Sequence, residues 1–280
     1  MDSNLIKRAA ETIERAEALV ICAGAGMGVD SGLPDFRGDK GFWKAYPAFG
    51  KLNLGFVDLA NPAWFEKDPA LAWGFYGHRL VLYRSTMPHR GFQILRGFAS
   101  RMKHGAYVFT SNVDGQFQKA GFAEDRVIEA HGSIHWMQCT GMCGAGIFSA
   151  EPYHLEIDLE TFRAREPWPS CPKCGALARP NILMFGDGEW EGTRSHDQSR
   201  RLHAWQHELP DTPGKLVIIE CGAGSAVPTV RSFSEQIVNL KKATLIRINP
   251  RECEVPPAQI GIDAGAMAAL DEINQAILAR

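Results

Sequence analysis

An apolar hexapeptide followed directly by a glycine cluster is the feature that most restricts how this chain can fold. Residues 18–23 read Ala-Leu-Val-Ile-Cys-Ala, and residues 24–28 read Gly-Ala-Gly-Met-Gly. A strand that is apolar on both faces is typical of the centre of a parallel sheet covered by helices. Glycines placed between such a strand and a helix let backbone N–H groups approach a pyrophosphate, although a plain strand-to-helix turn has the same composition. The position of the cluster in the chain favours the nucleotide site.

Further apolar runs extend this start into an alternation of strands and helices. Residues 5–16 carry apolar side chains at helical spacing, and residues 264–279 are rich in Ala, Leu and Ile, which predicts a closing helix. This alternation predicts an α/β fold with a Rossmann-like, doubly wound parallel sheet. The other runs that predict strands are residues 107–110, 127–129, 216–220 and 244–249.

Two long segments interrupt the alternation and predict a second, smaller domain. Residues 38 to 98 are rich in aromatic side chains and carry no strand signal, which predicts a loop followed by helices. The other segment holds four of the seven cysteines. We therefore predict a helical insertion (residues 39–99) and a zinc-ribbon insertion (136–179) that form the small domain. The Rossmann-like domain then comprises residues 1–38, 100–135 and 180–280.

Composition excludes several classes of protein. With 30 Lys and Arg against 32 Asp and Glu, the formal net charge of the 280 residues is −2, which argues against nucleic acid as a partner. Hydrophobic residues make up 45% of the chain, which is too many for a disordered protein. The longest apolar stretch, residues 18–29, is broken by glycines and shorter than the roughly 20 residues that span a bilayer, so no membrane partner is expected. The first residues do not resemble a signal peptide, and we expect a cytoplasmic protein.

The clustered cysteines predict a metal site. Cys139 and Cys143 are separated by three residues, whereas Cys171 and Cys174 are separated by two residues and followed by glycine. Four thiolates complete a tetrahedral zinc site and leave no open position, so the ion would be a single structural Zn²⁺. The spacer of residues 144–170 is longer than the roughly 15 to 20 residues of the common pattern, and a redox dithiol is the alternative.

Polar residues follow two of the predicted strands. Asn112 and Asp114 come just after residues 107–110, and His131 comes just after residues 127–129. Ligands of open α/β sheets bind beyond the carboxyl ends of the strands. There a carboxamide and a carboxylate can grip an amide, or simply form an Asx turn. A histidine at such a strand end can act as a general base, or be structural.

The glycine cluster is followed by an acid, an aromatic ring and a fixed cation. Residues 31–38 read Ser-Gly-Leu-Pro-Asp-Phe-Arg-Gly. This places Asp35, Phe36 and Arg37 beside the predicted phosphate turn. An ordinary surface loop with a local Asp–Arg pair is the alternative interpretation.

In this order, the motifs resemble those of the sirtuin family, whose members are NAD-dependent protein deacylases with a large Rossmann-like domain and a small zinc domain. The resemblance covers essentially the whole chain. It is carried by residues 24–37, 110–115, 131–132, the two cysteine pairs, and residues 179–187, 222–225 and 248–249.

The resemblance implies that NAD is a consumed co-substrate and that the substrate is an acylated lysine in an extended peptide. The acyl carbonyl oxygen attacks the ribose carbon that bears nicotinamide, and the products are nicotinamide, free lysine and O-acyl-ADP-ribose. By resemblance, Asn112 and Asp114 hold the nicotinamide amide, and His131 takes a proton from a ribose hydroxyl. The implied NAD contacts are Gly24, Ala25, Gly26, Asp35, Phe36, Arg37, Ser111, Asn112, Asp114, Gly222, Gly224, Ser225 and Asn249, and the implied peptide contacts are Ile182, Leu183, Phe185 and Gly186.

Tyr76 and Arg79 bear on the acyl group. Their Tyr-x-x-Arg spacing is similar to that of the sirtuin subclass that removes succinyl and malonyl groups. Residues three apart project from the same side of a helix, so a phenol and a guanidinium could bind one carboxylate together. A surface or interdomain pair is the alternative, and bacterial members with this pair often act on acetyl-lysine as well.

The chain also departs from the family pattern. Ser111 stands where a glutamine is usual, and Asn181, Met184 and Asp187 replace the more common His, Trp and Glu. The predicted function is that of an NAD-dependent protein-lysine deacylase. A protein ADP-ribosyltransferase or NAD glycohydrolase on the same scaffold is the alternative, which Ser111 favours and His131 disfavours. A catalytically weak sensor of NAD or ADP-ribose is a third possibility. The sequence does not indicate the oligomeric state.

Overall fold

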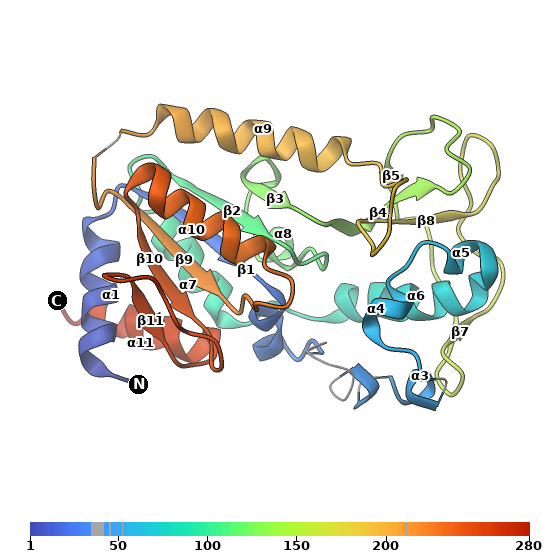
Figure 1. Cartoon of the computed structure of the whole chain (residues 1–280), viewed down its shortest axis with the longest axis horizontal. Coiled ribbons are helices and arrows are strands. Elements are labelled where there is room, and N and C mark those ends of the chain that lie inside the picture. The colour runs from blue at the N-terminus through green and yellow to red at the C-terminus, as the bar shows by residue number, and fades with distance from the viewer. Residues whose placement is uncertain (35–41, 45, 52, 211) are drawn as a thin grey trace.

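A six-stranded parallel sheet with the strand order β11-β10-β9-β1-β2-β3 forms one half of the molecule (Figure 1). The computed structural model describes residues 1–34, 42–44, 46–51, 53–210 and 212–280. The chain adds β2 and β3 on one side of β1, and later adds β9, β10 and β11 on the other side. The strand order therefore reverses between β1 and β9, which is where sheets of this kind bind ligands. The strands are β1 (Ala18–Ala23), β2 (Ala106–Thr110), β3 (Val127–Glu129), β9 (Leu216–Cys221), β10 (Thr244–Ile248) and β11 (Ile260–Ile262).

Five of these strands confirm the predicted runs to within one residue at each end, and the predicted α/β fold class is confirmed. The sequence analysis missed β11, because it is a three-residue edge strand with Gly261 at its centre. Helices α1 (Ser3–Arg15) and α11 (Ala266–Leu278) confirm the two predicted helices at the ends of the chain.

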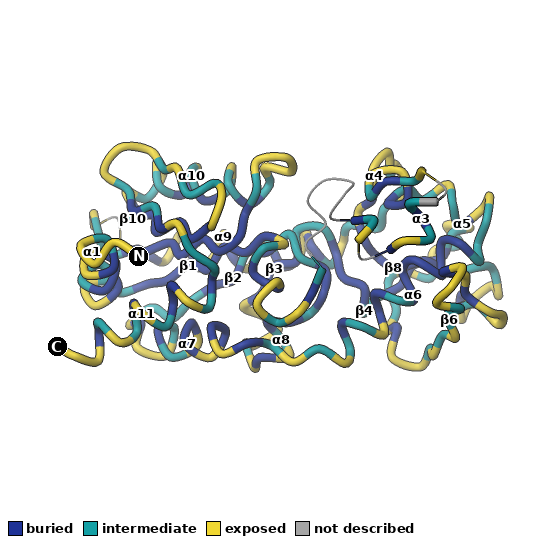
Figure 2. The backbone as a smooth tube through the Cα atoms, turned by 90° about the horizontal axis from the view of Figure 1, so that it is seen from below, coloured by how far each residue is buried: buried dark blue, intermediate teal, exposed yellow. Residues whose placement is uncertain are grey.

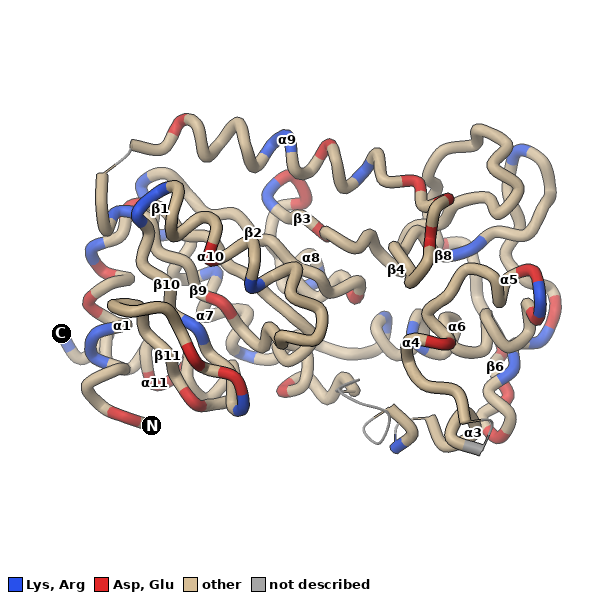
Figure 3. The backbone as a smooth tube through the Cα atoms, in the orientation of Figure 1, with Lys and Arg blue, Asp and Glu red and all other residues tan. Residues whose placement is uncertain are grey.

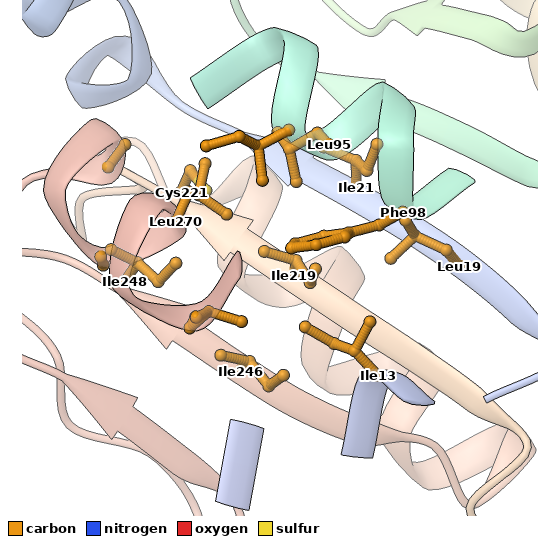
Figure 4. Packing of buried hydrophobic residues seen from close by; sticks show 14 of the residues in the cluster. Ile13, Leu19, Ile21, Leu95, Phe98, Ile219, Cys221, Ile246, Ile248 and Leu270 are labelled. Atoms are coloured by element: carbon orange, nitrogen blue, oxygen red, sulfur yellow. The ribbon is translucent and has the colours of Figure 1, made fainter. Parts of the chain in front are cut away.

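Helices cover both faces of the sheet. Alternate residues of a strand point to opposite faces, so each strand contributes to two cores. Leu19 and Ile21 of β1 face α1, α7 (Arg90–Ala99) and α11, whereas Val20 and Cys22 face α9 (Thr193–Glu208) and α10 (Thr229–Lys241). Figure 4 shows the first of these cores, in which Ile13, Leu95, Phe98 and Leu270 of the helices pack on Leu19, Ile21, Ile219 and Ile246 of the strands.

The other half of the molecule has a separate, aromatic core. The antiparallel sheet β5-β4-β8 and the two-stranded sheet β6-β7 pack there with the short helices and α6 (Pro69–Ser85). Gly74 lets α6 approach β7 closely, because a Cβ at this position would lie 1.8 Å from the carbonyl oxygen of Phe162. Figure 2 shows the buried backbone of both halves surrounded by exposed turns. The elements of this half are α3 (Pro47–Lys51), α4 (Phe56–Leu59), α5 (Trp64–Lys67), β4 (Gly132–Cys139), β5 (Phe148–Ser149), β6 (Ile157–Asp158), β7 (Arg163–Ala164) and β8 (Ala178–Ile182).

Helix α7 packs with the large sheet, although its residues fall within the predicted insertion of residues 39–99. Phe92, Leu95 and Phe98 belong to the same buried cluster as β1 and α11. Within the helical segment, α6 therefore packs in the aromatic core of the small half, whereas α7 packs in the core of the large sheet. The described part of the segment between residues 42 and 99 forms helices and no strand, as the sequence predicts.

Charged residues lie mainly outside the large sheet (Figure 3). Within its strands the charged residues are Glu129, Glu220 and Arg247. Glu220 and Arg247 form a buried ion pair on neighbouring strands, with 2.5 Å between Oε1 and Nε. None of the described helices is long and apolar enough to cross a membrane.

Candidate functional site

A cavity of about 620 Å³ lies between the two halves, at the carboxyl ends of β1, β2 and β9. The sheet side contributes residues that follow β1, β2, β3, β9 and β10, together with Val230 of α10, and the small half contributes residues of α4, α6 and the segment after β8. From the sheet side the lining residues include Gly24, Ala25, Ser111, Asn112, Val113, Asp114, His131, Gly222, Ala223, Gly224, Val230 and Glu252, and from the other side they include Phe56, Val57, Ala60, Tyr76, Arg79, Tyr83, Ile182, Leu183, Met184 and Phe185.

The loops after β1 and β9 touch each other through their backbones. A Cβ on Gly24 would lie 2.7 Å from Cα of Ala223, and one on Gly222 would lie 2.4 Å from the carbonyl carbon of Gly26. Gly222 also has a φ of +62°, a conformation that favours glycine. The glycine cluster continues into a 3₁₀ helix (Ala25–Ser31). The switch point of the sheet is thus lined by bare backbone, which is what close contact with a pyrophosphate requires.

The side chain of Asn112 is anchored to the glycine loop. Its Nδ2 donates to the carbonyl oxygen of Gly24 at 3.0 Å. Its backbone N–H donates to Oγ1 of Thr110, whose hydroxyl donates to the carbonyl oxygen of Ala23. These bonds connect the ends of β1 and β2, so the carboxamide is held in a fixed place on the cavity wall.

Asp114 is a buried carboxylate in the same wall. Its Oδ1 accepts the backbone N–H of Gln116 at 2.9 Å, and its carbonyl oxygen bonds Nε2 of His135 at 2.9 Å. Burial raises the pKa of Asp114 to about 6, although the Gln116 N–H and the Arg79 guanidinium favour the charged form. The group is therefore ionised above neutral pH and ready to accept an N–H from a ligand.

His131 lies beyond the end of β3, where the sequence predicts a base. Its Nε2 is 3.1 Å from Oγ1 of Thr229, the first residue of α10. Burial lowers the pKa of His131 below its ordinary value of 6.5, which keeps the imidazole neutral at pH 7. A neutral imidazole that lines a cavity can accept a proton from a ligand hydroxyl.

The two loops expected at the phosphates and the adenosine ribose are tied together. Nδ2 of the fully buried Asn249 and Nε of Arg231 both donate to the carbonyl oxygen of Ala223, at 2.8 and 3.2 Å. The carboxylate of Glu252 accepts the backbone N–H of Ser225 at 2.7 Å. The side chain of Asn249 thus supports the loop in this structure rather than facing the cavity.

The segment after β8 forms a ledge between the sheet side of the cavity and the small half. Leu183 donates its backbone N–H to the carbonyl oxygen of His131 at 2.9 Å, and Phe185 donates its own to the carbonyl oxygen of Ala60 at 2.8 Å. The side chains of Leu183 and Phe185 remain 38% and 39% exposed, although both are large and apolar. Such exposure on a cavity rim is typical of a surface that binds a partner.

A buried ion pair shapes the turn at the end of this ledge. Arg179 donates from Nη1 and Nη2 to the two carboxylate oxygens of Asp187, at 2.7 and 2.8 Å. The side chains of the pair are 3% and 0% exposed. Asp187 also accepts the backbone N–H groups of Met184 and Glu189. The aspartate that departs from the family pattern therefore fixes the turn in the segment that the resemblance expects to contact a peptide.

Tyr76 and Arg79 lie on α6 and line the cavity opposite the sheet. Both are buried, at 1% and 6% exposure, which excludes the alternative of a surface pair. Arg79 donates from Nε to the hydroxyl of Tyr83, one helical turn further on, at 3.0 Å. Its guanidinium carbon also lies 5.2 to 5.9 Å from the ring centroids of four aromatic residues, Phe56, Phe75, Tyr76 and Tyr83.

Most of the predicted site residues that the structure describes come together in this cavity. Gly26, Gly186, Ser225 and Asn249 do not line it, and Asp35, Phe36 and Arg37 lie outside the described residues. Sequence analysis missed several residues of the site. Tyr83 could have been found from its position one turn after Arg79, whereas Thr229 and Glu252 carry no local signal. The missed residues include Phe56, Tyr83, Val113, Thr229, Val230 and Glu252.

The four paired cysteines converge at the far end of β4. Their sulfur atoms all lie within 4.8 Å of one another, and the pairs Cys139–Cys174 and Cys143–Cys171 are 3.6 and 3.5 Å apart. Tetrahedral zinc with Zn–S bonds of about 2.3 Å separates its sulfurs by about 3.8 Å, so the cluster fits a structural zinc ion. Met142, with a φ of +48°, absorbs the extra residue of the first pair.

The sequence comparisons agree with this geometry. A model of the Sir2 family matches residues 24–202. An NAD-dependent protein deacylase of Archaeoglobus fulgidus is 30% identical over 276 residues, which cover 98% of this chain and 96% of the relative. A deacylase of Caldanaerobacter subterraneus is 33% identical over 187 residues, or 67% of each chain. One of Pseudomonas aeruginosa is 35% identical over 178 residues, or 63% of this chain and 65% of the relative.

Solved structures show the same fold over the whole chain. A Sir2 homologue mutant in complex with ADP-ribose has a TM-score of 0.70 at 29% identity, and the match covers 100% of this chain and 97% of that one. A Sir2 homologue in complex with NAD has a TM-score of 0.69 at 29% identity, with 100% and 94% coverage. With a family match over more than half of its length and a relative aligned almost from end to end, the chain belongs to the Sir2, or sirtuin, family.

Proposed function

We propose that the protein is an NAD-dependent protein-lysine deacylase. The observation that carries this proposal is one cavity that combines the bare-backbone switch point, Asn112, Asp114 and the neutral imidazole of His131. Those groups match what the reaction needs, namely backbone that can bind a pyrophosphate, two side chains that can bind a carboxamide, and a general base. NAD, when bound, supplies a ribose carbon that becomes electrophilic as nicotinamide departs.

The residues of the sheet side hold and orient the dinucleotide. Gly24 and Gly222 let the loops after β1 and β9 pack against each other, since a Cβ on either glycine would meet the other loop, and both glycines line the cavity where the pyrophosphate would lie. Asp114 accepts the N–H₂ of the nicotinamide amide while Asn112 fixes the same amide from its anchored position. The negative charge of Asp114 is deeply buried, where an electrostatic interaction with a ligand is stronger than in water.

With NAD bound, His131 would be the base that takes a proton from a ribose hydroxyl, which would then supply the nucleophile for the acyl carbon. General base catalysis of this type contributes a factor of about 10² to 10⁴ in rate. The contact with Thr229 at 3.1 Å orients the ring before the substrate arrives. Because the imidazole is neutral at pH 7, it needs no prior loss of a proton.

The acyl group would enter from the side of α6. Tyr76 and Arg79 present a phenol and a guanidinium to the cavity, which supports an acyl chain that ends in a carboxylate, as in malonyl- or succinyl-lysine. The peptide itself would lie on the ledge of Leu183 and Phe185. The backbone N–H groups of these two residues already donate within the chain, so the apolar side chains are what they would offer to the peptide.

One mass-spectrometric assay tests the proposal. The purified protein is incubated with NAD and with acetyl-lysine and succinyl-lysine peptides of the same sequence, and nicotinamide and peptide masses are followed together. We expect the peptide to lose its acyl group in step with nicotinamide release, with the succinyl peptide preferred. Nicotinamide release from unchanged peptides, or peptides that gain ADP-ribose, would contradict the deacylase and support the hydrolase or transferase.

A further inference from the structure

The 3₁₀ helix of residues 25–31, which we call the glycine helix, joins two parts of the cavity wall. Gly24 and Ala25 line the cavity at its start, and Leu33 and Pro34 line it just beyond its end. The helix has seven residues, although 3₁₀ runs longer than three or four residues are uncommon because their hydrogen bonds have poor geometry. Two of the seven are glycines, which lose the most conformational freedom on folding. We therefore expect contacts from outside the segment to hold it in place.

His89 makes such contacts, although it lies 58 residues beyond Ser31 in the chain. Its Nε2 donates to the carbonyl oxygen of Met27 at 2.9 Å, and its backbone N–H donates to Oγ of Ser31 at 3.0 Å. Its Nδ1 accepts the backbone N–H of Gly91 at 3.0 Å, which caps the amino end of α7. One residue therefore joins the glycine helix to a helix that packs on the large sheet.

The imidazole of His89 is held in one orientation and one protonation state. A carbonyl oxygen only accepts and an amide N–H only donates, so the two ring bonds require the neutral imidazole with its proton on Nε2. Burial lowers the pKa of His89 below its ordinary value of 6.5, which keeps the ring neutral at pH 7. The ring packs edge-on against Phe92 at 4.9 Å between centroids, and a Cβ on Gly91 would lie 2.6 Å from its Cε1. The first turn of α7 is thus shaped to hold this ring.

Asp30 provides a second support for the glycine helix, on the side of α11. Its Oδ2 accepts the backbone N–H of Met267, the second residue of α11, at 2.8 Å. Asp30 is exposed, whereas Met27 and His89 are buried. A hydrogen bond shielded from water is electrostatically stronger than an exposed one, so the contact of His89 is the firmer of the two supports.

We propose that His89 is a positioning residue for NAD, which holds the glycine helix so that the backbone at Gly24 and Ala25 is in place before the dinucleotide binds. A site that is ordered in advance binds more tightly, because less conformational freedom is lost on binding. The inference rests on the proposed function for the identity of the ligand. His89 does not line the cavity and acts through the backbone of residues 25–31.

The substitution His89→Asn separates the two bonds of the ring. Asparagine is a favoured N-cap residue, so its side-chain oxygen can replace Nδ1 as the acceptor for Gly91, but the shorter side chain loses the bond to Met27. We expect the dissociation constants of NAD and of ADP-ribose, measured by titration calorimetry without peptide, to rise about three- to tenfold. At saturating NAD, kcat and the KM for the acyl-lysine peptide should change less than about twofold, since the bond serves binding and not the chemical step.

His89→Ala removes both ring bonds. It should weaken the binding of NAD and ADP-ribose about as much as His89→Asn does, but should lower the melting temperature further because α7 also loses its cap. His104→Asn is the matched control, since it makes the same change before the amino end of β2, outside the cavity lining. Its dissociation constants should equal those of the wild type. If either His89 variant is recovered unfolded, Ser31→Ala takes its place, and a rise in both dissociation constants is again expected.

The outcomes separate this inference from the proposed function. Wild-type affinity in His89→Asn, with weak binding only in His89→Ala, would overturn the inference, because His89 would then be only a helix cap. A lower kcat at unchanged affinity would contradict it as well. If the wild type binds NAD and ADP-ribose but removes no acyl group, the deacylase proposal fails and the calorimetry still decides the role of His89. A wild type that binds neither ligand would overturn both.

Discussion

The two walls of the cavity are built in different ways. On the sheet side, the ends of parallel strands and two glycine loops set the shape, and the backbone makes the closest approaches. On the other side, one helix presents Tyr76, Arg79 and Tyr83, and side-chain contacts set the geometry. A wall of backbone suits the part of a reaction that is the same for every substrate. A wall of side chains can change with the acyl group while the sheet stays as it is.

Removal of the metal should have the largest effect, because it should disrupt the helical side of the cavity and leave the sheet side folded. Structural zinc contributes folding energy directly, on the order of 10 kcal/mol or more in small zinc modules. We expect a chelator to release one zinc per chain and abolish deacylation, while ADP-ribose still protects β1 and β9 from hydrogen exchange. Cys171→Ser should have the same effect, whereas Cys253→Ser, outside the cluster, should retain zinc and activity. Activity that survives complete zinc loss would show that the helical wall does not need the cluster.

The substitution His131→Tyr should remove the catalytic base from the sheet side of the cavity and leave the binding of ADP-ribose intact. We expect deacylation to fall by a factor of about 10² to 10⁴, while the dissociation constant of ADP-ribose changes less than about threefold. In the wild type, the acid limb of the kcat/KM profile should lie below pH 6.5, because burial lowers the pKa of His131. The exposed His203, changed to Tyr, serves as the control. Persistent deacylation in His131→Tyr would exclude this residue as the base.

Adding one methyl group by a glycine-to-alanine substitution should destabilise the protein at the contact between the two glycine loops, but not on an exposed helix surface. In Gly24→Ala the new Cβ would lie 2.7 Å from Cα of Ala223, so the two loops must separate. We expect the KM for NAD to rise about tenfold and the protein to lose about 1 to 3 kcal/mol of unfolding free energy. Gly97→Ala, on α7 with no atom within 4 Å of the new Cβ, should instead gain up to about 1 kcal/mol. Steady-state kinetics and urea unfolding report both quantities, and equal behaviour of the two variants would refute the close contact.

The last effect concerns Asp114 and appears only as a dependence of stability on pH. Its pKa rises from 3.8 to about 6 on folding, so the native state holds the proton more tightly and stability falls as pH rises through this window. Above pH 6 the buried charge costs up to about 3 kcal/mol, at 1.36 kcal/mol per pKa unit. We expect Asp114→Asn to be more stable than the wild type at pH 7 but not at pH 3.5, and to lose activity. A stability difference that does not vary with pH would show that Asp114 is not strained by burial.

Much of the fold could be predicted because its signals are local. Residues 18–23 are apolar on both faces and form the central strand β1, as predicted. Gly24 and Gly222 sit where only a bare backbone fits. The cysteine pairs converge despite the extra residue of the first pair, since Met142 adopts a left-handed conformation that its sequence context does not reveal.

The rest of the site depends on contacts between distant residues. Asn249 carries a carboxamide suited to a ribose, yet its side chain bonds Ala223, because two loops meet there. His131 finds Thr229 at a separation of 98 residues, and no spacing rule connects them. Helix α7 follows α6 closely in sequence but packs on the other core, because its apolar face matches β1 and α11.

The sequence by itself determined the class of fold, the strands that end at the cavity, the zinc ligands and the family resemblance. Each of these rests on residue type and short spacing, which act within a few residues of the chain. Only the tertiary structure decided which side chains share one cavity, that Tyr83 accepts the Nε–H of Arg79, and that burial shifts the pKa values of Asp114 and His131 in opposite directions. Those properties depend on burial and orientation, and both arise only when distant segments of the chain pack together.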